Sequence, residues 1–268
     1  MISIITRKND LISLGFYKAF KTLYKDVNFI TYPNEYCKIK DSKIVMINNF
    51  DNLNLISLNK KTIVLFLSKN IIYENKLITE NIKYYNIEEY SNDKSYDDYI
   101  NTEKFMYIKG NKIIMPYLSI YTKSEILYNF KNNLLNKEIN DFDYTKIYMI
   151  KNHIKGVIKN LKIKKLKIIN RLNKYQEKKL IEENNIFMSF SDIDKFDSKS
   201  LSYMSLGSLS MTNSIINKLY IHNTILNGDI NDIKDFNNQI KYNLIKNVQD
   251  IYNNYTFEKY VIILDKIL

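Results

Sequence analysis

Short apolar runs rich in β-branched side chains recur along the whole chain and alternate with polar or helix-like stretches. The clearest runs are residues 2–6 (ISIIT), 43–47 (KIVMI) and 62–67 (TIVLFL). Runs this short and this uniformly apolar are typical of strands that are buried on both faces of a parallel sheet. Because strands that alternate with helices form βαβ units, the sequence predicts an α/β protein with mostly parallel sheets.

Other segments extend this pattern along the chain. Helices are expected at residues 14–24 and 232–251, where apolar residues recur at helical spacing. Thr256 is expected to cap a final helix, because its hydroxyl can accept a hydrogen bond from a backbone amide of the first turn. Further strands are expected at residues 27–32, 83–87, 105–109, 112–116, 146–150, 164–169, 186–190, 209–212 and 219–221.

A polar, Asn-rich stretch separates two series of strands and helices. It covers residues 123–145 and is interpreted as a linker that is helical only in part. The flanking segments, residues 1–122 and 146–250, each hold enough alternating strands and helices for one α/β domain. Residues 251–268 are expected to form a final helix. Since ligands of open α/β sheets bind outside the carboxyl ends of the strands, two facing domains predict a cleft between them.

The composition places further bounds on the chain. It has 268 residues, 45% of them hydrophobic, which is enough for a large core. No apolar stretch reaches the ~20 residues of a membrane span, and the N-terminus lacks the apolar region of a signal peptide. A single cysteine, Cys37, excludes a disulfide framework and a Cys-based zinc site. We therefore expect a cytoplasmic protein, in the host cytoplasm if the source is viral.

The formal net charge of +11 favours a polyanionic partner, because clustered cations release the counterions of phosphate groups. Only Arg7 and Arg171 among the 40 basic residues are arginines, however, and arginine is the residue that reads base edges best. Lysine, asparagine, isoleucine and tyrosine are all abundant, as expected of an AT-rich genome. We interpret the charge mainly as a result of this codon bias.

Several sequence motifs of common enzyme classes are missing. The chain has no P-loop, GxGxxG, HExxH or GxSxG pattern. Nucleotide hydrolases of the P-loop type, Rossmann dehydrogenases, zinc proteases and α/β-hydrolases therefore lose support.

The stretch DKFDSKSLSYMSLGSLSMTN at residues 194–213 is the most informative part of the sequence. It places Gly207 between a predicted serine-rich helix and a predicted strand. Glycine is expected there because the chain must leave the helix and turn at once, and glycine adopts the left-handed conformation without a Cβ penalty.

This stretch resembles the nucleotide-sugar half of GT-B-fold glycosyltransferases, whose pattern is E-x-F-G-x-S-x-L-E-A-M-A-x-G followed by a strand. The matching residues here are Asp194, Phe196, Leu201, Ser202, Met204 and Gly207. The order of predicted elements over essentially the whole chain is also similar to that of phage DNA glucosyltransferases, which are compact GT-B enzymes.

The sequence departs from the family pattern at several positions. Ser202 replaces the glutamate that grips the ribose through two hydroxyls, and a serine can accept only one such bond. The glycine-rich turn after the first donor-domain strand is Lys151-Asn152 here, and the first N-terminal loop is TRKND. Ser68 stands where the phage enzymes have an aspartate that is thought to act as the base.

The resemblance implies donor-binding roles for residues that follow the predicted strands. Asp194 would contact the donor sugar, and Lys151, Lys155 and Arg171 would pair with its diphosphate. Ser202 and Gly207 complete this set. Each residue also has a simpler interpretation: Asp194 as a loop or cap residue, the lysines as a solvated face, and Arg171 as half of a surface ion pair.

Proton transfer would fall to His153 or Asp10. His153 could carry a proton near the phosphates, although a lone histidine beside a strand is also expected as a structural or exposed residue. Asp10 lies in the loop after the first strand, where a general base could face an acceptor. The same residue can cap the helix that follows, and we favour that interpretation.

The fold that the resemblance implies consists of two Rossmann-like domains facing across a cleft (GT-B-like). The C-terminal domain would bind a nucleotide sugar, with a UDP-sugar expected, and the N-terminal domain would receive a hydroxyl acceptor. No metal and no further cofactor are expected. The acceptor would be either a modified base in duplex DNA or a surface or virion glycan. The alternative is a non-catalytic GT-B-like binding protein that has lost donor chemistry.

Overall fold

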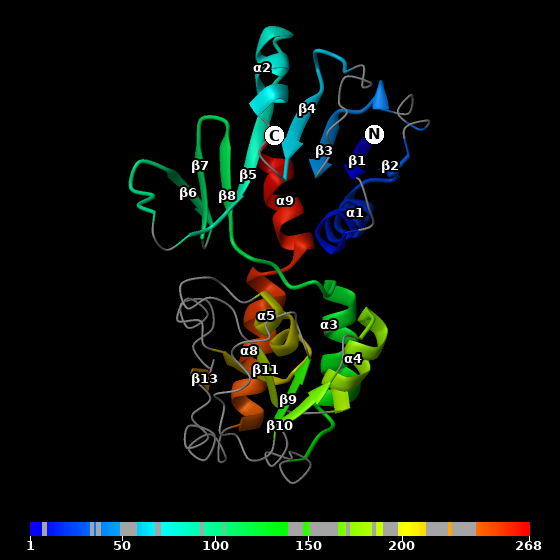
Figure 1. Cartoon of the computed structure of the whole chain (residues 1–268), viewed down its shortest axis with the longest axis vertical. Coiled ribbons are helices and arrows are strands. Elements are labelled where there is room, and N and C mark those ends of the chain that lie inside the picture. Colours follow the sequence, from blue (N-terminus) through cyan, green and yellow to red (C-terminus); the bar gives the residue numbers. More distant parts are fainter. Residues whose placement is uncertain are drawn as a thin grey trace. The chain divides into compact units, whose positions relative to one another are not determined.

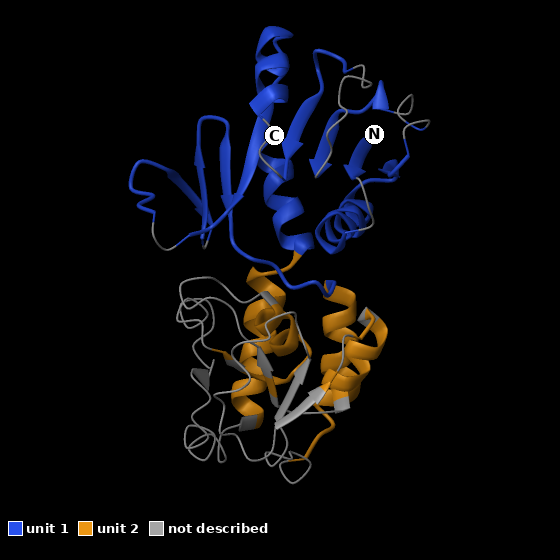
Figure 2. Ribbon diagram, in the orientation of Figure 1, with its two compact units in different colours: residues 1–122, 257–268 blue, residues 123–256 orange. Residues whose placement is uncertain are grey.

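The structure, a computed structural model, divides the chain into two compact units, which Figure 2 shows in different colours. Unit 1 comprises residues 1–122 and 257–268, and unit 2 comprises residues 123–256. The residues that the structure describes are 1–6, 10–32, 35, 39–48, 58–67, 71–91, 94–103, 105–138, 147–150, 166–169, 172–183, 186–189, 198–212, 225–226 and 240–268.

Unit 1 contains a sheet of eight strands in the order β2-β1-β3-β4-β5-β8-β7-β6 (Figure 1). The first six strands of this order run parallel, and β7 and β6 extend the sheet as antiparallel strands. The strands are β1 (Ile2–Thr6), β2 (Val27–Ile30), β3 (Ile44–Asn48), β4 (Ile63–Phe66), β5 (Tyr84–Glu89), β6 (Ile100–Glu103), β7 (Met106–Lys109) and β8 (Lys112–Met115).

The central strands of unit 1 are buried on both faces, which confirms the interpretation of their uniformly apolar sequences. Every residue of β1 and β3 is buried. Because successive side chains of a strand point to opposite faces, Ile4 belongs to one hydrophobic cluster and its neighbour Ile5 to another. The sheet therefore has a separate core on each face.

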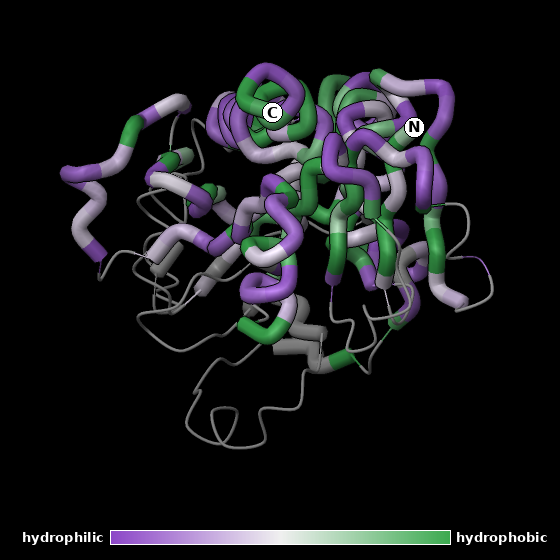
Figure 3. Tube along the Cα trace, turned by 90° about the horizontal axis from the view of Figure 1, so that it is seen from above, coloured by the Kyte–Doolittle hydropathy of each residue, from purple (hydrophilic) through white to green (hydrophobic). Residues whose placement is uncertain are grey.

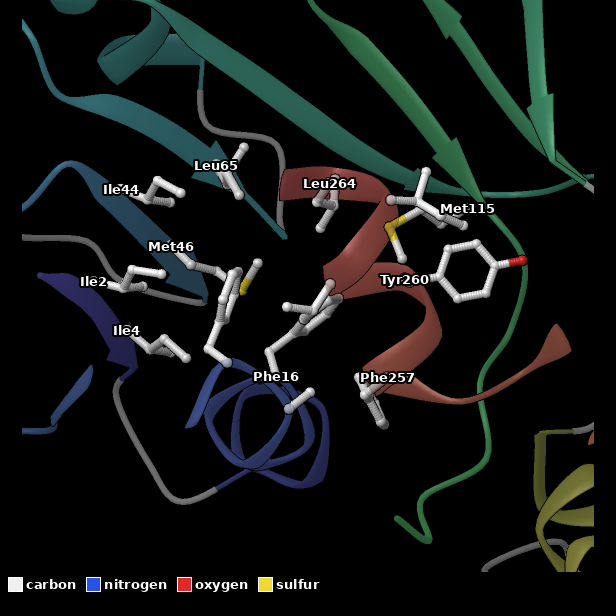
Figure 4. Packing of buried hydrophobic residues seen from close by; sticks show 14 of the residues in the cluster. Ile2, Ile4, Phe16, Ile44, Met46, Leu65, Met115, Phe257, Tyr260 and Leu264 are labelled. Atoms are coloured by element: carbon white, nitrogen blue, oxygen red, sulfur yellow. The ribbon is translucent and has the colours of Figure 1, made fainter. Parts of the chain in front are cut away.

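Helices cover both faces of this sheet. Helix α2 (Ile71–Thr79) contributes Tyr73 and Leu77 to one cluster. On the other face, α1 (Leu11–Leu23) and α9 (Phe257–Ile267) pack against each other and against the strands. Figure 4 shows buried side chains of these two helices together with strand residues of the same cluster. Figure 3 shows hydrophobic and hydrophilic residues alternating along the helix that ends at the C-terminus, as expected of a helix with one buried face.

Unit 2 contains a parallel sheet of five strands in the order β10-β9-β11-β12-β13. Its helices include α5, which packs on α8, and α3, which also contacts α8. The strands are β9 (Ile147–Ile150), β10 (Leu166–Ile169), β11 (Ile186–Ser189), β12 (Leu209–Thr212) and β13 (Ile225–Leu226). The helices are α3 (Lys123–Asn129), the π-helix η3 (Phe130–Leu134), α4 (Lys174–Glu183), α5 (Ser198–Ser205) and α8 (Ile240–Asn254).

The structure corrects two expectations about the segments between the units. Residues 123–134, part of the stretch interpreted as a partly helical linker, are helical as α3 and η3 and belong to unit 2. Ile126, Phe130 and Leu134 recur at helical spacing, and Ile126 and Leu134 are buried, so this polar stretch contains an amphipathic helix. The final helix begins at Phe257 rather than at residue 251, because α8 continues to Asn254. The strand expected at residues 219–221 lies outside the described residues.

None of the helices in the described part of the chain is long and apolar enough to cross a membrane.

Candidate functional site

The strand order of unit 1 reverses at one point, between β1 and β3. The chain first steps from β1 to β2 on one side and then crosses to β3 on the other side. In open parallel sheets this arrangement opens a crevice at the carboxyl ends of the two strands, and ligands bind there. The two strands end at Thr6 and Asn48, which are partners in the sheet register.

A cluster of polar side chains occupies this end of unit 1. The Thr6 hydroxyl donates to Asp10 Oδ2 at 2.8 Å, and the backbone amide of Ser13 donates to Asp10 Oδ1 at 2.8 Å. Asn48 Nδ2 donates to the Ser13 hydroxyl at 3.1 Å. These bonds tie the loop after β1 and the first turn of α1 to the end of β3.

Asp10 is the N-cap of α1, as the favoured sequence interpretation predicted. Burial raises the pKa of its carboxyl, but the hydrogen bonds from Ser13, Thr6 and Asn48 outweigh burial and leave this pKa below its ordinary value. A carboxylate with a lowered pKa binds a proton weakly. The contacts of Asp10 therefore suit a structural cap better than a general base.

Replacing Asp10 with alanine should lower the free energy of unfolding of unit 1 by about 1–2 kcal/mol, because the amides of the first turn of α1 lose their acceptor. Asp10→Asn should lower this free energy much less, since asparagine caps helices as well as aspartate does. Urea unfolding of both variants, followed by circular dichroism, tests this difference. Equal losses for the two variants would contradict the capping role.

The same contacts make a prediction about pH. Because the folded-state pKa of Asp10 lies below the ordinary value of 3.8, its charge stabilises the fold at neutral pH. This contribution should disappear as the pH falls from 3.8 through the folded-state pKa. The stability difference between the wild type and Asp10→Asn should therefore be constant above about pH 5 and shrink in acid. A difference that grows in acid would contradict the assignment.

A second carboxylate lies at the same edge of the sheet, at the end of β5. Glu89 is exposed, and the Tyr117 hydroxyl donates a hydrogen bond to it. Burial, and then the charge of Glu89, raise the pKa of Tyr117, so that its phenol stays protonated and keeps this bond. Sequence analysis did not single out Glu89. The signal was available, because Glu88 and Glu89 directly follow the predicted strand at residues 83–87.

The sheet of unit 2 has the same kind of reversal, between β9 and β11. The chain steps from β9 to β10 on one side and crosses to β11 on the other. Lys151, His153 and Lys155 follow the end of β9 in the sequence, Arg171 follows β10, and Asp194 follows β11. These five side chains lie outside the described residues, as does Ser68, so their predicted roles stay predictions.

The turn from α5 into β12 has the geometry that the sequence predicted for Gly207. Its φ is +79°, in the left-handed region. The Gly207 amide donates to the Met204 carbonyl at 3.0 Å, and the Ser208 amide donates to the Tyr203 carbonyl at 3.2 Å. This pair of bonds defines a Schellman motif, which closes the helix and directs the chain straight into the strand.

Packing against η3 adds a second requirement for glycine. A Cβ at Gly207 would lie 3.1 Å from Leu134 Cδ2. Close by, Asn129 Nδ2 donates to the Leu206 carbonyl at 2.6 Å, and both groups are buried. The turn is thus held by the segment that the sequence had suggested as a linker.

Three serines of α5 and one of β12 are buried: Ser200, Ser202, Ser205 and Ser210. Ser202 is 2% exposed, and its backbone carbonyl accepts a hydrogen bond of 2.7 Å from the Ser205 hydroxyl. Ser200 on α5 and Ser210 on β12 are hydrogen-bonded to each other. Small polar side chains allow the helix to approach the strand closely while their hydroxyls stay bonded. Ser202, predicted as a donor contact, and Gly207 both lie within this packed interior.

No family model and no curated protein matches the chain. Among the residues with described positions there is also no group of three or more His, Cys, Asp or Glu side chains that could hold a metal ion.

Solved structures of an alpha-glucosyltransferase match nearly the whole chain. In complex with UDP and a 13-mer DNA containing an A:G mismatch, this enzyme aligns with a TM-score of 0.52 and 9% identity, over 99% of this chain and 98% of its own. A complex with UDP and DNA containing an HMU base aligns with a TM-score of 0.51 and 10% identity, over 99% of this chain and 98% of that enzyme. A complex with UDP-glucose and DNA containing an abasic site aligns with a TM-score of 0.50 and 10% identity, over 99% of this chain and 97% of that enzyme. The chain therefore has a GT-B-like fold of mixed α/β class with largely parallel sheets.

Proposed function

We propose that this protein is a glycosyltransferase that moves a sugar from a nucleotide sugar to a hydroxyl acceptor. The observation that carries the proposal is the match of the fold over 99% of the chain to an alpha-glucosyltransferase seen with UDP and UDP-glucose. In this proposal the two units are the GT-B domains, which face each other across a cleft. Unit 2 takes the nucleotide sugar, a UDP-sugar, and unit 1 takes the acceptor.

The donor would bind at the carboxyl edge of the unit 2 sheet. Support comes from the strand reversal between β9 and β11, because open α/β sheets bind ligands at such reversals. Lys151, Lys155 and Arg171 would neutralise the diphosphate as it leaves, and Asp194 would contact the sugar. Ser202 and Gly207 would act from the interior, by holding α5 and the turn after it.

A general base would be needed to take the proton of the acceptor hydroxyl. His153 and Asp10 are the sequence candidates, and Glu89 joins them because it is an exposed carboxylate at the carboxyl edge of unit 1. Asp10→Asn and Glu89→Gln separate the two carboxylates: the variant that removes the base lowers kcat strongly while donor affinity stays unchanged.

The acceptor is either a modified base in duplex DNA or a surface or virion glycan. The solved structures support the first, since the alpha-glucosyltransferase was bound to DNA. Binding of duplex DNA that weakens steeply with salt would favour DNA as the acceptor.

A second candidate is a non-catalytic binding protein with the same fold. The burial of Ser202, at the position of the ribose-binding glutamate in the family pattern, favours it. The hydrogen bonds that hold Asp10 as a cap also favour it, because they weaken this carboxylate as a base.

Thermal unfolding against a panel of nucleotides and nucleotide sugars separates the two candidates. A ligand at a hundredfold its Kd should stabilise the native state by about 2.7 kcal/mol. We expect a shift with uridine nucleotides that is lost in Lys151→Gln/Arg171→Gln and kept in a control with two exposed lysines of unit 1 replaced, Lys18→Gln/Lys25→Gln. The absence of a shift with every nucleotide would refute the glycosyltransferase and leave the binding protein.

A further inference from the structure

A group of aromatic side chains lies where the sheet of unit 1 extends beyond its parallel strands. In the strand order β7 follows β8 and β6 forms the edge, which Figure 1 shows at one end of this sheet. The rings come from β7, from the turn before it and from the chain between β5 and β6. They are Tyr90, Tyr96, Tyr99, Phe105 and Tyr107, here called the aromatic cluster.

The aromatic cluster lies on one face of this extension. Met106 and Ile108 of β7 pack in the hydrophobic core under α1 and α9. Because successive side chains of a strand alternate, Tyr107 points to the opposite face. The Tyr96 ring stacks on Tyr107, with ring centres 4.8 Å apart and ring planes 13° apart. Aromatic rings therefore cover this part of the sheet.

Packing explains only part of the aromatic cluster. Tyr96 is 9% exposed, and its hydroxyl accepts a hydrogen bond of 3.0 Å from the Ser91 amide, so this ring fixes the loop after β5. Tyr90, Phe105 and Tyr107, in contrast, are only half-buried. Half-exposed aromatic side chains that gather in one place are typical of binding surfaces.

Phe105 holds a backbone conformation that is unfavourable for its side chain. Its φ is +59°, in the left-handed region. The other described residues with positive φ are Asn81, Gly110 and Gly207, which are of the types that tolerate this region. The turn from β7 to β8 thus uses Gly110, whereas the turn from β6 to β7 uses a phenylalanine. A strained bulky residue destabilises the fold, and such strain is typical of ligand-binding and active sites.

The strained turn lies at the edge of the sheet where ligands bind. Tyr107 is opposite Ile114 in the antiparallel register, so β7 begins beside the carboxyl end of β8. Phe105 there packs on Tyr90, which follows the end of β5, with ring centres 4.9 Å apart. Since parallel sheets bind ligands at the carboxyl ends of their strands, the aromatic cluster reaches the edge where unit 1 would take its acceptor.

The lysines around the aromatic cluster are paired with carboxylates. Lys109 Nζ lies 3.4 Å from Asp98 Oδ2. Lys94 Nζ and Lys112 Nζ lie 3.6 and 3.7 Å from the two carboxylate oxygens of Glu88. A phosphate would have to compete with these carboxylates for the same cations. This charge balance favours an uncharged ligand.

An uncharged ring fits the remaining contacts. Burial, and then the neighbouring Tyr107 and Tyr96, raise the pKa of Tyr90, so its phenol stays uncharged at neutral pH. Aromatic side chains bind nucleobases by stacking on their flat faces. The C–H face of a sugar ring makes similar van der Waals contacts.

We propose that the aromatic cluster is a stacking site for an uncharged ring, with Phe105 and Tyr90 as the main contacts. The ring is the acceptor group, a nucleobase or a sugar, and this role rests on the proposed function. The stacking itself needs no sugar transfer.

The test measures binding of two uncharged probes, deoxycytidine and cellobiose, to the full chain by ligand-detected NMR, with and without UDP. We expect one of the two to bind. Phe105→Asn and Tyr90→Ala should each weaken this binding by about tenfold or more, the usual effect of losing one stacked ring. The matched control, Tyr32→Ala, removes an exposed ring that follows β2, at the other end of the strand order, and should bind like the wild type.

Thermal unfolding separates a binding role from a packing role. Asparagine tolerates positive φ, so Phe105→Asn should unfold at the same temperature as the wild type or higher, although it binds the probe less tightly. A variant that loses stability but binds the probe like the wild type would show that the ring serves only packing. Binding of neither probe, or equal weakening in Tyr32→Ala, would also overturn the inference.

The outcomes also distinguish this inference from the proposed function. Binding of deoxycytidine indicates a nucleobase acceptor, and binding of cellobiose indicates a glycan. Probe binding in a protein that no nucleotide stabilises would leave the stacking site and refute the glycosyltransferase. Stabilisation by a nucleotide without probe binding would do the reverse.

Discussion

Replacing Ser202 with glutamate should lower the free energy of unfolding of unit 2 by about 3–5 kcal/mol, the typical cost of an unpaired buried charge. The sequence pattern alone suggests the opposite result, because this exchange restores the ribose-binding glutamate of the GT-B family. The physical reason for the loss is the position of the side chain. Ser202 on α5 is 2% exposed, so a carboxylate at this position would lose its contact with water.

Hydrogen exchange during urea unfolding measures the effect in unit 2 separately from unit 1. Ser202→Ala is the matched control, and it should lower the free energy of unfolding by only about 1 kcal/mol, because it removes one hydroxyl and adds no charge. The penalty of the glutamate should shrink as the pH falls, because burial raises its pKa and the neutral acid costs less to bury. A stable Ser202→Glu variant that binds a nucleotide sugar more tightly than the wild type would show that the residue faces a ligand.

The second large effect is expected where α9 packs on α1 in unit 1. A Cβ on Gly15 would lie only 2.4 Å from Phe257 Cε2. The Phe257 ring is buried and meets Phe16 edge-on, with ring centres 5.0 Å apart. Phe257→Ala should therefore lower the free energy of unfolding of unit 1 by about 3–5 kcal/mol, the usual range for loss of a buried aromatic ring.

Gly15→Ala should destabilise unit 1 by about 2 kcal/mol, because overpacking outweighs the better helix propensity of alanine. In the Phe257→Ala background the ring is absent. Gly15→Ala should then stabilise unit 1 by about 1 kcal/mol, which is the difference in helix propensity between alanine and glycine. This reversal of sign is the measured quantity, obtained from urea unfolding of the four proteins. Equal effects of Gly15→Ala in both backgrounds would mean that the two residues do not interact.

The position of most strands could be predicted from the sequence because burial on both faces leaves a local signature. Residues 2–6 and 209–212 were placed to the residue. β6 was missed because its sequence, INTE, is polar and mostly exposed. It is a strand because it pairs with β7, and no local pattern reports that pairing.

Some features of the candidate site likewise follow from the local sequence, whereas others depend on strand pairing. The left-handed turn at Gly207 and the cap at Asp10 follow from short-range stereochemistry, so a motif of a few residues was enough to predict them. Glu89 and Tyr117 meet only because β5 and β8 are neighbours in the sheet, although β6 and β7 separate them in the sequence.

The sequence by itself determined the α/β class, the limits of most strands and two helix-end motifs, because each depends on residues that are close in the chain. Only the tertiary structure decided the strand order with its reversals beside β1 and β9, the burial of Ser202, the inclusion of α3 and η3 in unit 2 and the packing of α9 on Gly15. These features depend on contacts between residues far apart in sequence, and such contacts are selected by the packing of the whole unit.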